Sequence, residues 1–150
     1  MSDGDFSKTR RRLPHWRLDG ATYFITFRLL AQPLLPDEIT LVRDHIAAGD
    51  GRFYDLLCVM AMPDHVHAAL VPRDGYDLAR ITKGIKGATA RLLNGRRGTH
   101  GVVWQDESWD RIVRGQDELL RELDYMFENP RRAGLTNDPW TWAGWWYRPQ

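Results

Sequence analysis

The sequence has few of the features that mark secreted, membrane-bound or polybasic proteins. Cys58 is its only cysteine, which argues against a disulfide framework or a cysteine-ligated zinc site. It has no run of about 18 apolar residues, and its charged N-terminus lacks the apolar centre of a signal peptide. We therefore expect a cytoplasmic protein that does not associate with membranes and buries the Cys58 thiol within the apolar stretch LLCVMAM.

The charge is almost balanced, with 21 Lys and Arg against 20 Asp and Glu. Any nucleic-acid surface must therefore come from local clustering. One cluster is N-terminal, and we interpret residues 1–17 as a basic arm in which Arg10, Arg11 and Arg12 are candidate DNA contacts. A chain of 150 residues can bury roughly two-thirds of its unfolded surface as one domain. We assign residues 18–150 to that domain.

The hydrophobic pattern predicts alternating strands and helices. Residues 21–30 alternate as a strand does, and a short break at Pro63-Asp64 between two apolar runs favours a hairpin. Apolar positions recur at helical spacing elsewhere. The elements expected are strands at 21–30, 53–62, 65–71, 102–105 and 110–113, and helices at 37–49, 77–94 and 116–128. This order is typical of an α+β domain, an antiparallel sheet with helices mainly on one face.

Two pairs of residues could carry chemistry. His65 and His67 lie two apart on an expected strand, so their imidazoles share a face about 6.5 to 7 Å apart and could bind one cation. Tyr125 and Asn129 lie four apart on the last helix and could present a phenol beside an amide oxygen. Each pair taken alone is also compatible with a structural role, as polar residues at a strand start and as a boundary tyrosine.

Positive charge is concentrated between residues 78 and 114, which contain eight basic and three acidic residues. Lys83 and Lys86 are each followed by a glycine, which would let a phosphate backbone approach closely. Arg96 and Arg97 lie in the Gly-rich segment 95–101, which we expect to be a loop. These four residues are further candidate DNA contacts, although a merely solvated basic face fits equally well. The Trp-rich segment 140–146 could stack on bases, but we favour a lid over the sheet for Trp140 and Trp142.

Six segments in the same order resemble the HUH single-tyrosine transposases, and specifically the REP-associated tyrosine transposases related to small insertion-sequence transposases. The segments are RRLPHW at 11–16, ATYFITFRL at 21–29, MPDHVHAAL at 62–70, ITKGIKGATARLLN at 81–94, VWQDESWDRIV at 103–113 and YMFENPRRAGL at 125–135.

The resemblance implies a ferredoxin-like sheet that carries His65 and His67 as metal ligands on a central strand, with Tyr125 as the nucleophile. Asn129 occupies the position of a third ligand, which is commonly Gln in the wider superfamily. The implied cofactor is Mg²⁺ or Mn²⁺, and the implied substrate is single-stranded DNA bearing a hairpin, as in palindromic repeats.

The implied reaction is cleavage and rejoining through a covalent 5′-phosphotyrosine, and we favour a monomer over a dimer. Two other functions remain open from the sequence. One is a non-catalytic domesticated protein that binds DNA hairpins, and the other is a metal phosphodiesterase that uses water as the nucleophile.

Overall fold

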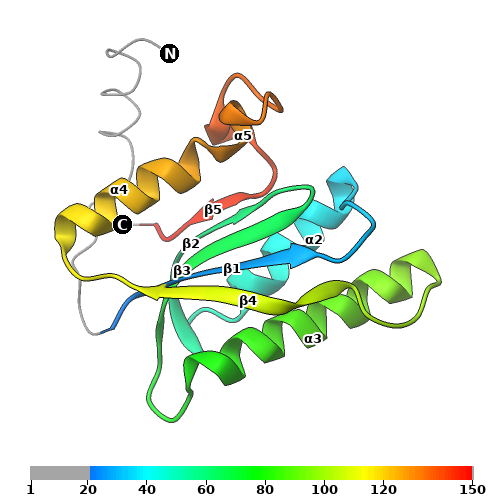
Figure 1. Cartoon of the computed structure of the whole chain (residues 1–150), viewed down its shortest axis with the longest axis horizontal. Coiled ribbons are helices and arrows are strands. Elements are labelled where there is room, and N and C mark those ends of the chain that lie inside the picture. Colours follow the sequence, from blue (N-terminus) through cyan, green and yellow to red (C-terminus); the bar gives the residue numbers. More distant parts are fainter. Residues whose placement is uncertain (1–20, 150) are drawn as a thin grey trace.

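The computed structural model describes residues 21–149, which form one five-stranded sheet and its covering helices (Figure 1). The predicted basic arm at 1–17, with Arg10, Arg11 and Arg12, lies outside the described residues. The elements are β1 (Tyr23–Leu29), α2 (Pro36–Ala48), β2 (Tyr54–Ala61), β3 (His65–Pro72), α3 (Leu78–Arg97), β4 (Trp104–Ile112), α4 (Gln116–Phe127), α5 (Asn129–Arg132), the 3₁₀ helix η1 (Pro139–Thr141) and β5 (Trp145–Tyr147).

The strand order is β4-β1-β3-β2-β5, and every pairing is antiparallel. The segment from β1 to β4 has the order βαββαβ, and its four strands lie in the spatial order 4-1-3-2. This is the ferredoxin-like arrangement. The predicted α+β class with an antiparallel sheet is therefore confirmed.

The helices cover both faces of the sheet, more evenly than the predicted placement mainly on one face. Helices α2 and α3, the two longest, share one face, and α4 and α5 lie on the other (Figure 1). The physical reason is that β2 is apolar on both of its faces. Val59 and Ala61 face the α2/α3 core, whereas Cys58 and Met60 face the α4 core. Cys58 is fully buried, as expected.

Strand β4 and helix α3 differ in extent from the sequence prediction. The two short strands expected at 102–105 and 110–113 belong to one strand, β4. Helix α3 continues to Arg97 and ends at Gly98, whose positive φ of 67° suits a glycine at a helix end. Arg96 and Arg97 therefore lie in the last turn of α3, not in a loop.

The Trp-rich segment near the C-terminus completes the sheet. Residues 145–147 form β5 beside β2, while the ring centroid of Trp140 lies 4.9 Å from that of Phe127 in the α4 core. Trp142 donates its indole N–H to the carbonyl of Ala61 at 2.9 Å. Trp140 and Trp142 thus pack as a lid, as favoured from the sequence. No helix within residues 21–149 is long and apolar enough to cross a membrane.

Candidate active site

His65 and His67 lie at the start of β3 on the sheet face that α4 and α5 cover. Successive side chains of a strand point to opposite faces, so Val66 and Ala68 enter the α2/α3 core while the two histidines face the other way. Their ring centroids are 4.6 Å apart. The alternation of the strand therefore brings both imidazoles to one small area of this face of the sheet.

Each imidazole is oriented by a hydrogen bond at Nδ1. The Nδ1 of His67 lies 2.8 Å from the hydroxyl oxygen of Thr26, its direct partner on β1. The Nδ1 of His65 lies 2.6 Å from a carboxylate oxygen of Asp64. Outer hydrogen bonds of this kind fix the orientation of metal-ligating histidines. They leave the Nε2 atoms of both rings as candidate ligand atoms.

Asn129 contributes a third polar group to the same place. Its amide Nδ2 lies 3.1 Å from Nε2 of His65, at the first residue of α5. The sequence placed Asn129 and Tyr125 on a single helix, but α4 ends at Phe127, and Glu128 separates it from α5. Rotation of the amide would turn the carbonyl oxygen of Asn129 towards the histidines. The structure thus brings together the three predicted metal ligands.

Both histidines are held in the neutral state. Burial lowers the pKa of His67 to about 3, and the charges of His65, Arg28 and Arg132 add to the effect. Burial also lowers the pKa of His65, against the opposing influence of Asp64. A neutral imidazole is the form that binds a metal ion. The pair is therefore ready to bind a cation near neutral pH without first losing a proton.

Tyr125 lies on α4, on the same side of the sheet as the histidines. Its side chain is exposed, with 61% of its surface accessible. The guanidinium of Arg132 lies 3.8 Å from the centre of the Tyr125 ring, and Arg132 also donates a hydrogen bond to the Tyr125 carbonyl at 2.8 Å. The charge of Arg132 also contributes to lowering the pKa of His67, so this cation lies between the Tyr125 ring, which it contacts, and the imidazole of His67, which it influences.

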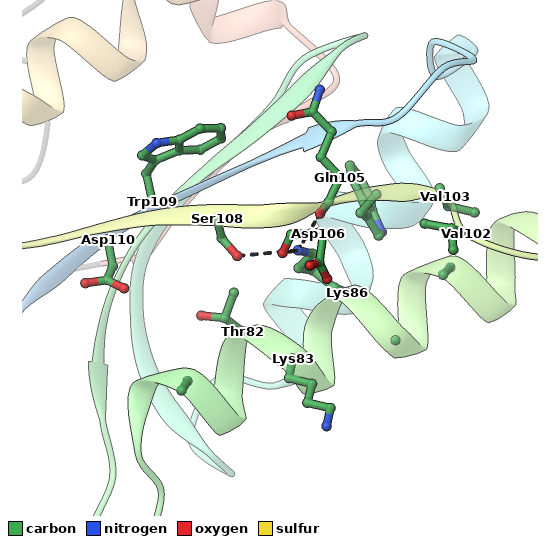
Figure 2. Close-up of a pocket in the computed structure, with 14 residues that line it drawn as sticks. Thr82, Lys83, Lys86, Val102, Val103, Gln105, Asp106, Ser108, Trp109 and Asp110 are labelled. Atoms are coloured by element: carbon green, nitrogen blue, oxygen red, sulfur yellow. Dashed lines mark hydrogen bonds between the residues drawn. The ribbon is translucent and has the colours of Figure 1, made fainter.

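Sequence reasoning missed two exposed residues beside the histidines. On β1, Arg28 is the direct partner of His65, and on β4, Trp109 is the direct partner of Thr26. Two strand spacings place Trp109 roughly 10 Å from His67 on the same face. Trp109 is 47% exposed and projects from β4 away from α3 (Figure 2). The alternation of side chains along β4 could have indicated which face of the sheet Trp109 occupies. It could not have indicated that the histidines lie nearby.

The four candidate DNA contacts on α3 lie on the opposite face from the histidines. Lys83 is exposed beside a groove of about 530 Å³ between α3 and β4 (Figure 2). The ammonium of Lys86 instead donates to the carbonyls of Gln105 and Asp106 in β4, at 2.7 and 3.1 Å. Those carbonyls belong to a bulge in which residues 105–107 oppose the single residue Arg28.

Arg96 and Arg97 bind helix α2. Arg96 pairs with Asp37 at the surface, where both side chains are about half exposed. Arg97 pairs with Glu38 at 2.7 Å, and the Glu38 side chain is only 3% exposed. The hydrogen bond from Arg97 holds the pKa of Glu38 below its ordinary value. Lys86 and Arg97 thus have structural partners within the domain, which the sequence did not indicate.

The donor set formed by the two histidines and Asn129 fits a divalent cation. Imidazole nitrogens suit Mn²⁺, and an amide oxygen suits both Mn²⁺ and Mg²⁺. Among residues 21–149 no group of three or more His, Cys, Asp or Glu could hold a metal ion, and the amide of Asn129 is the polar group that contacts His65 at this place. Asp64 and Thr26 complete the outer shell that such sites require.

Comparisons with known proteins give one consistent family. A family model described as Transposase IS200 like matches residues 47–113. A Haemophilus influenzae protein named as a REP-associated tyrosine transposase is 23% identical in an alignment of 91 residues, which covers 54% of this chain and 52% of that protein. The match therefore spans about half the length of this relative.

Two solved structures share the fold. A REP-associated tyrosine transposase bound to a REP hairpin superposes with a TM-score of 0.65 at 18% identity, over 87% of this chain and 79% of the other. A Deinococcus radiodurans protein named as a transposase superposes with a TM-score of 0.52 at 19% identity, over 79% of this chain and 96% of the other. The chain is thus similar to the IS200-like transposases and, among them, to the REP-associated tyrosine transposases, which confirms the resemblance seen in its sequence.

Proposed function

We propose that the protein is a metal-dependent endonuclease and strand transferase that cleaves and rejoins single-stranded DNA bearing a hairpin. The observation that supports this best is the position of Tyr125. Its exposed ring lies against Arg132 on the same face as His65 and His67, and Asn129 contacts His65. A nucleophile, a cation and a set of metal ligands on one open face suit attack on a phosphodiester.

His65, His67 and Asn129 would hold Mg²⁺ or Mn²⁺ in this proposal. Such an ion, when bound, neutralises charge on a phosphate and orients it. Asp64 and Thr26 keep the two rings turned so that both Nε2 atoms are available. This arrangement needs no movement of β3, because the rings already share a face and lie close together.

Tyr125 would attack the phosphorus atom. The phenol loses its proton, a bond forms between the tyrosine oxygen and phosphorus, and the bond from phosphorus to the 3′ oxygen breaks. The leaving oxygen takes a proton and becomes a 3′-OH, while the protein carries a 5′-phosphotyrosine. Arg132 favours this step because its guanidinium lies over the ring, where negative charge develops on the phenol. The reverse step with a second 3′-OH rejoins the strand without ATP.

The open face beside the histidines offers contacts for the strand. Arg28 can meet a phosphate next to His65, and Trp109 can stack on a base one or two nucleotides away. Arg10, Arg11, Arg12, Lys83 and Arg96 remain candidates for contacts to more distant phosphates. Lys86 and Arg97 are weaker candidates because their charged groups bind partners in less exposed contacts within the domain, whereas the Arg96–Asp37 pair is about half exposed. The hairpin bound to the solved relative supports this substrate class.

The decisive experiment is a search for the covalent adduct. The protein is incubated with Mn²⁺ and single-stranded palindromic repeats labelled downstream of the hairpin, and the products are separated on a denaturing gel. We expect a labelled protein band for the wild type and for Tyr23→Phe, and none for Tyr125→Phe, which should still bind the DNA. Tyr23 is a matched control because it lies on β1 outside this group of residues.

Other outcomes would identify the alternative functions. Cleavage without a protein-linked product would indicate a phosphodiesterase that uses water. Hairpin binding without cleavage in Mn²⁺ or Mg²⁺ would indicate a DNA-binding protein. A labelled band that persists in Tyr125→Phe would remove Tyr125 from the role of nucleophile.

A further inference from the structure

A second pocket lies on the side of the sheet opposite the histidines. It has a volume of about 490 Å³ and lies between the C-terminal end of α2, the turn before β2 and the first half of α3. The residues that shape it are Arg52, Phe53, Tyr76, Arg80, Gly84 and Ala88. Its volume falls in the range of small-molecule and cofactor sites. None of these residues takes part in the proposed cleavage.

Two aromatic rings and two guanidinium groups form one wall of this pocket. The rings of Phe53 and Tyr76 meet edge to face, with centroids 5.3 Å apart. Arg52 lies over the Phe53 ring at 5.5 Å, and Arg80 lies over the Tyr76 ring at 5.3 Å. Phe53 is 40% exposed. Aromatic rings next to arginines are the groups that bind a nucleobase together with its phosphate.

The charged side chains that line the pocket itself favour an anion. No Asp or Glu lines it, and within residues 21–149 neither Arg52 nor Arg80 forms an ion pair. Arg96 and Arg97 on the same helix are both paired with carboxylates. Helix α3 contains six basic residues and no acidic residue. Arg52 and Arg80 are thus available to a ligand, and the exposed Arg91 lies further along α3.

Small residues leave the pocket open. Gly84 lies on the α3 face that lines it, and a Cβ atom built there would meet nothing within 4 Å. Ala88 lies one turn further along the same face. A larger side chain at position 84 would occupy the space between α2 and α3 without backbone strain, because Gly84 is helical and has no positive φ.

We infer that this pocket binds an unpaired nucleotide of a single-stranded nucleic acid, with the base against Phe53 and Tyr76 and its flanking phosphates at Arg52 and Arg80. A base within a duplex is stacked on both sides and cannot enter. A strand fits better than a free nucleotide, because a further exposed cation, Arg91, lies close enough to the lining residue His45 to contribute to lowering its pKa. The site lies on the other face from Tyr125, and its occupation does not depend on the cleavage proposed above.

The test separates insertion of a base from attraction to the basic surface. Binding of short single-stranded oligonucleotides that contain 2-aminopurine is followed by fluorescence, using full-length Tyr125→Phe protein in EDTA so that no cleavage can occur. Gly84→Leu fills the pocket and keeps every charge, so we expect affinity to fall about tenfold and quenching of the base to be lost. Gly95→Leu is the matched control on the same helix, since its Cβ also meets nothing and it does not line the pocket. We expect it to bind within about twofold of the parent.

Three results would overturn the inference. One is unchanged affinity and quenching in Gly84→Leu with an unchanged melting temperature. A second is 2-aminopurine mononucleotide binding as tightly as the oligonucleotide, which would indicate a free nucleotide as the ligand. A third is equal affinity for single strands and for a blunt duplex. Phe53→Ala gives a check if Gly84→Leu does not fold, and it should reduce affinity by a similar factor.

Discussion

The two faces of the sheet differ in how completely the helices cover them. Under α2 and α3 the sheet is covered by a continuous apolar core, and the nearly buried pair of Arg97 and Glu38 joins the two helices. On the other face, α4 and α5 cover one part of the sheet and leave Arg28 and Trp109 exposed beside the histidines. The comparison teaches that the apolar core under α2 and α3 and the polar group beside the histidines can be altered separately. Substitutions in that core and its ion pair, on the closed face, should affect folding, and those beside the histidines, on the open face, should affect the proposed reaction.

The largest effect that we expect is on the open face. His67→Ala removes one of the two imidazole ligands, so binding of Mn²⁺ and metal-dependent cleavage should both fall below detection. Calorimetric titration of Mn²⁺ and the adduct gel measure these two effects. His100→Ala is the control, because His100 is an exposed residue that follows α3. Wild-type affinity for Mn²⁺ in His67→Ala would mean that the histidines do not form the metal site.

The next largest effect is on the closed face. Arg97→Ala leaves the buried carboxylate of Glu38 without its main partner, and we expect a loss of about 3 to 5 kcal/mol in the free energy of unfolding. Arg96→Ala breaks the neighbouring exposed pair and should cost about 1 kcal/mol or less. Urea unfolding of both variants measures the difference. Equal losses would show that the two ion pairs contribute alike and that burial of Glu38 is unimportant.

A smaller effect should come from the outer shell of the histidines. Thr26→Val removes the hydroxyl that orients His67, and we expect Mn²⁺ affinity to fall about 10-fold to 100-fold. Thr26→Ser keeps the hydroxyl and should restore most of the affinity. If serine and valine behave alike, the hydrogen bond does not position the ring.

The smallest effect is a pH dependence of stability on the closed face. Arg97 lowers the pKa of Glu38 below its ordinary value near 4.5, so the folded protein favours the ionised carboxylate. The stabilisation is complete above about pH 4.5 and is lost as the pH falls through the lowered pKa of the folded state. Glu38→Gln should therefore have a lower melting temperature than the wild type at pH 7. The difference between the two melting temperatures should decrease on acidification to pH 3. A gap that grows on acidification would have the wrong sign for this explanation.

Local patterns predicted most of the fold but only part of the site. The alternation of β3 placed His65 and His67 on one face, and helical spacing found α2, α3 and α4 within a few residues. The residues that contact the histidines were harder to predict from the sequence. Asp64 is adjacent in the chain, but Thr26 lies 41 residues from His67, and Trp109 reaches the same area only through two strand registers. Pairing register depends on long-range packing, which no local pattern contains.

The charges on α3 show the same limit. A run of basic residues without acidic ones indicates a surface that attracts phosphate, and the exposed Lys83 fits that interpretation. The carboxylate that binds Arg97 lies 59 residues away on α2, and the acceptors of Lys86 are main-chain carbonyls of β4. Composition cannot distinguish a lysine that faces solvent from one whose ammonium group binds the main-chain carbonyls of a β-bulge.

The bulge at residues 105–107 of β4, whose carbonyls bind Lys86, also affects how the protein avoids unwanted association. An edge strand with unpaired carbonyls is a template for strands of other molecules, and natural proteins protect such edges with bulges, charges or very short strands. On β4, the bulge interrupts the ladder and Lys86 occupies two of its carbonyls. The opposite edge, β5, is only three residues long. Both edges of the described sheet thus carry features that oppose edge-to-edge pairing with strands of other molecules.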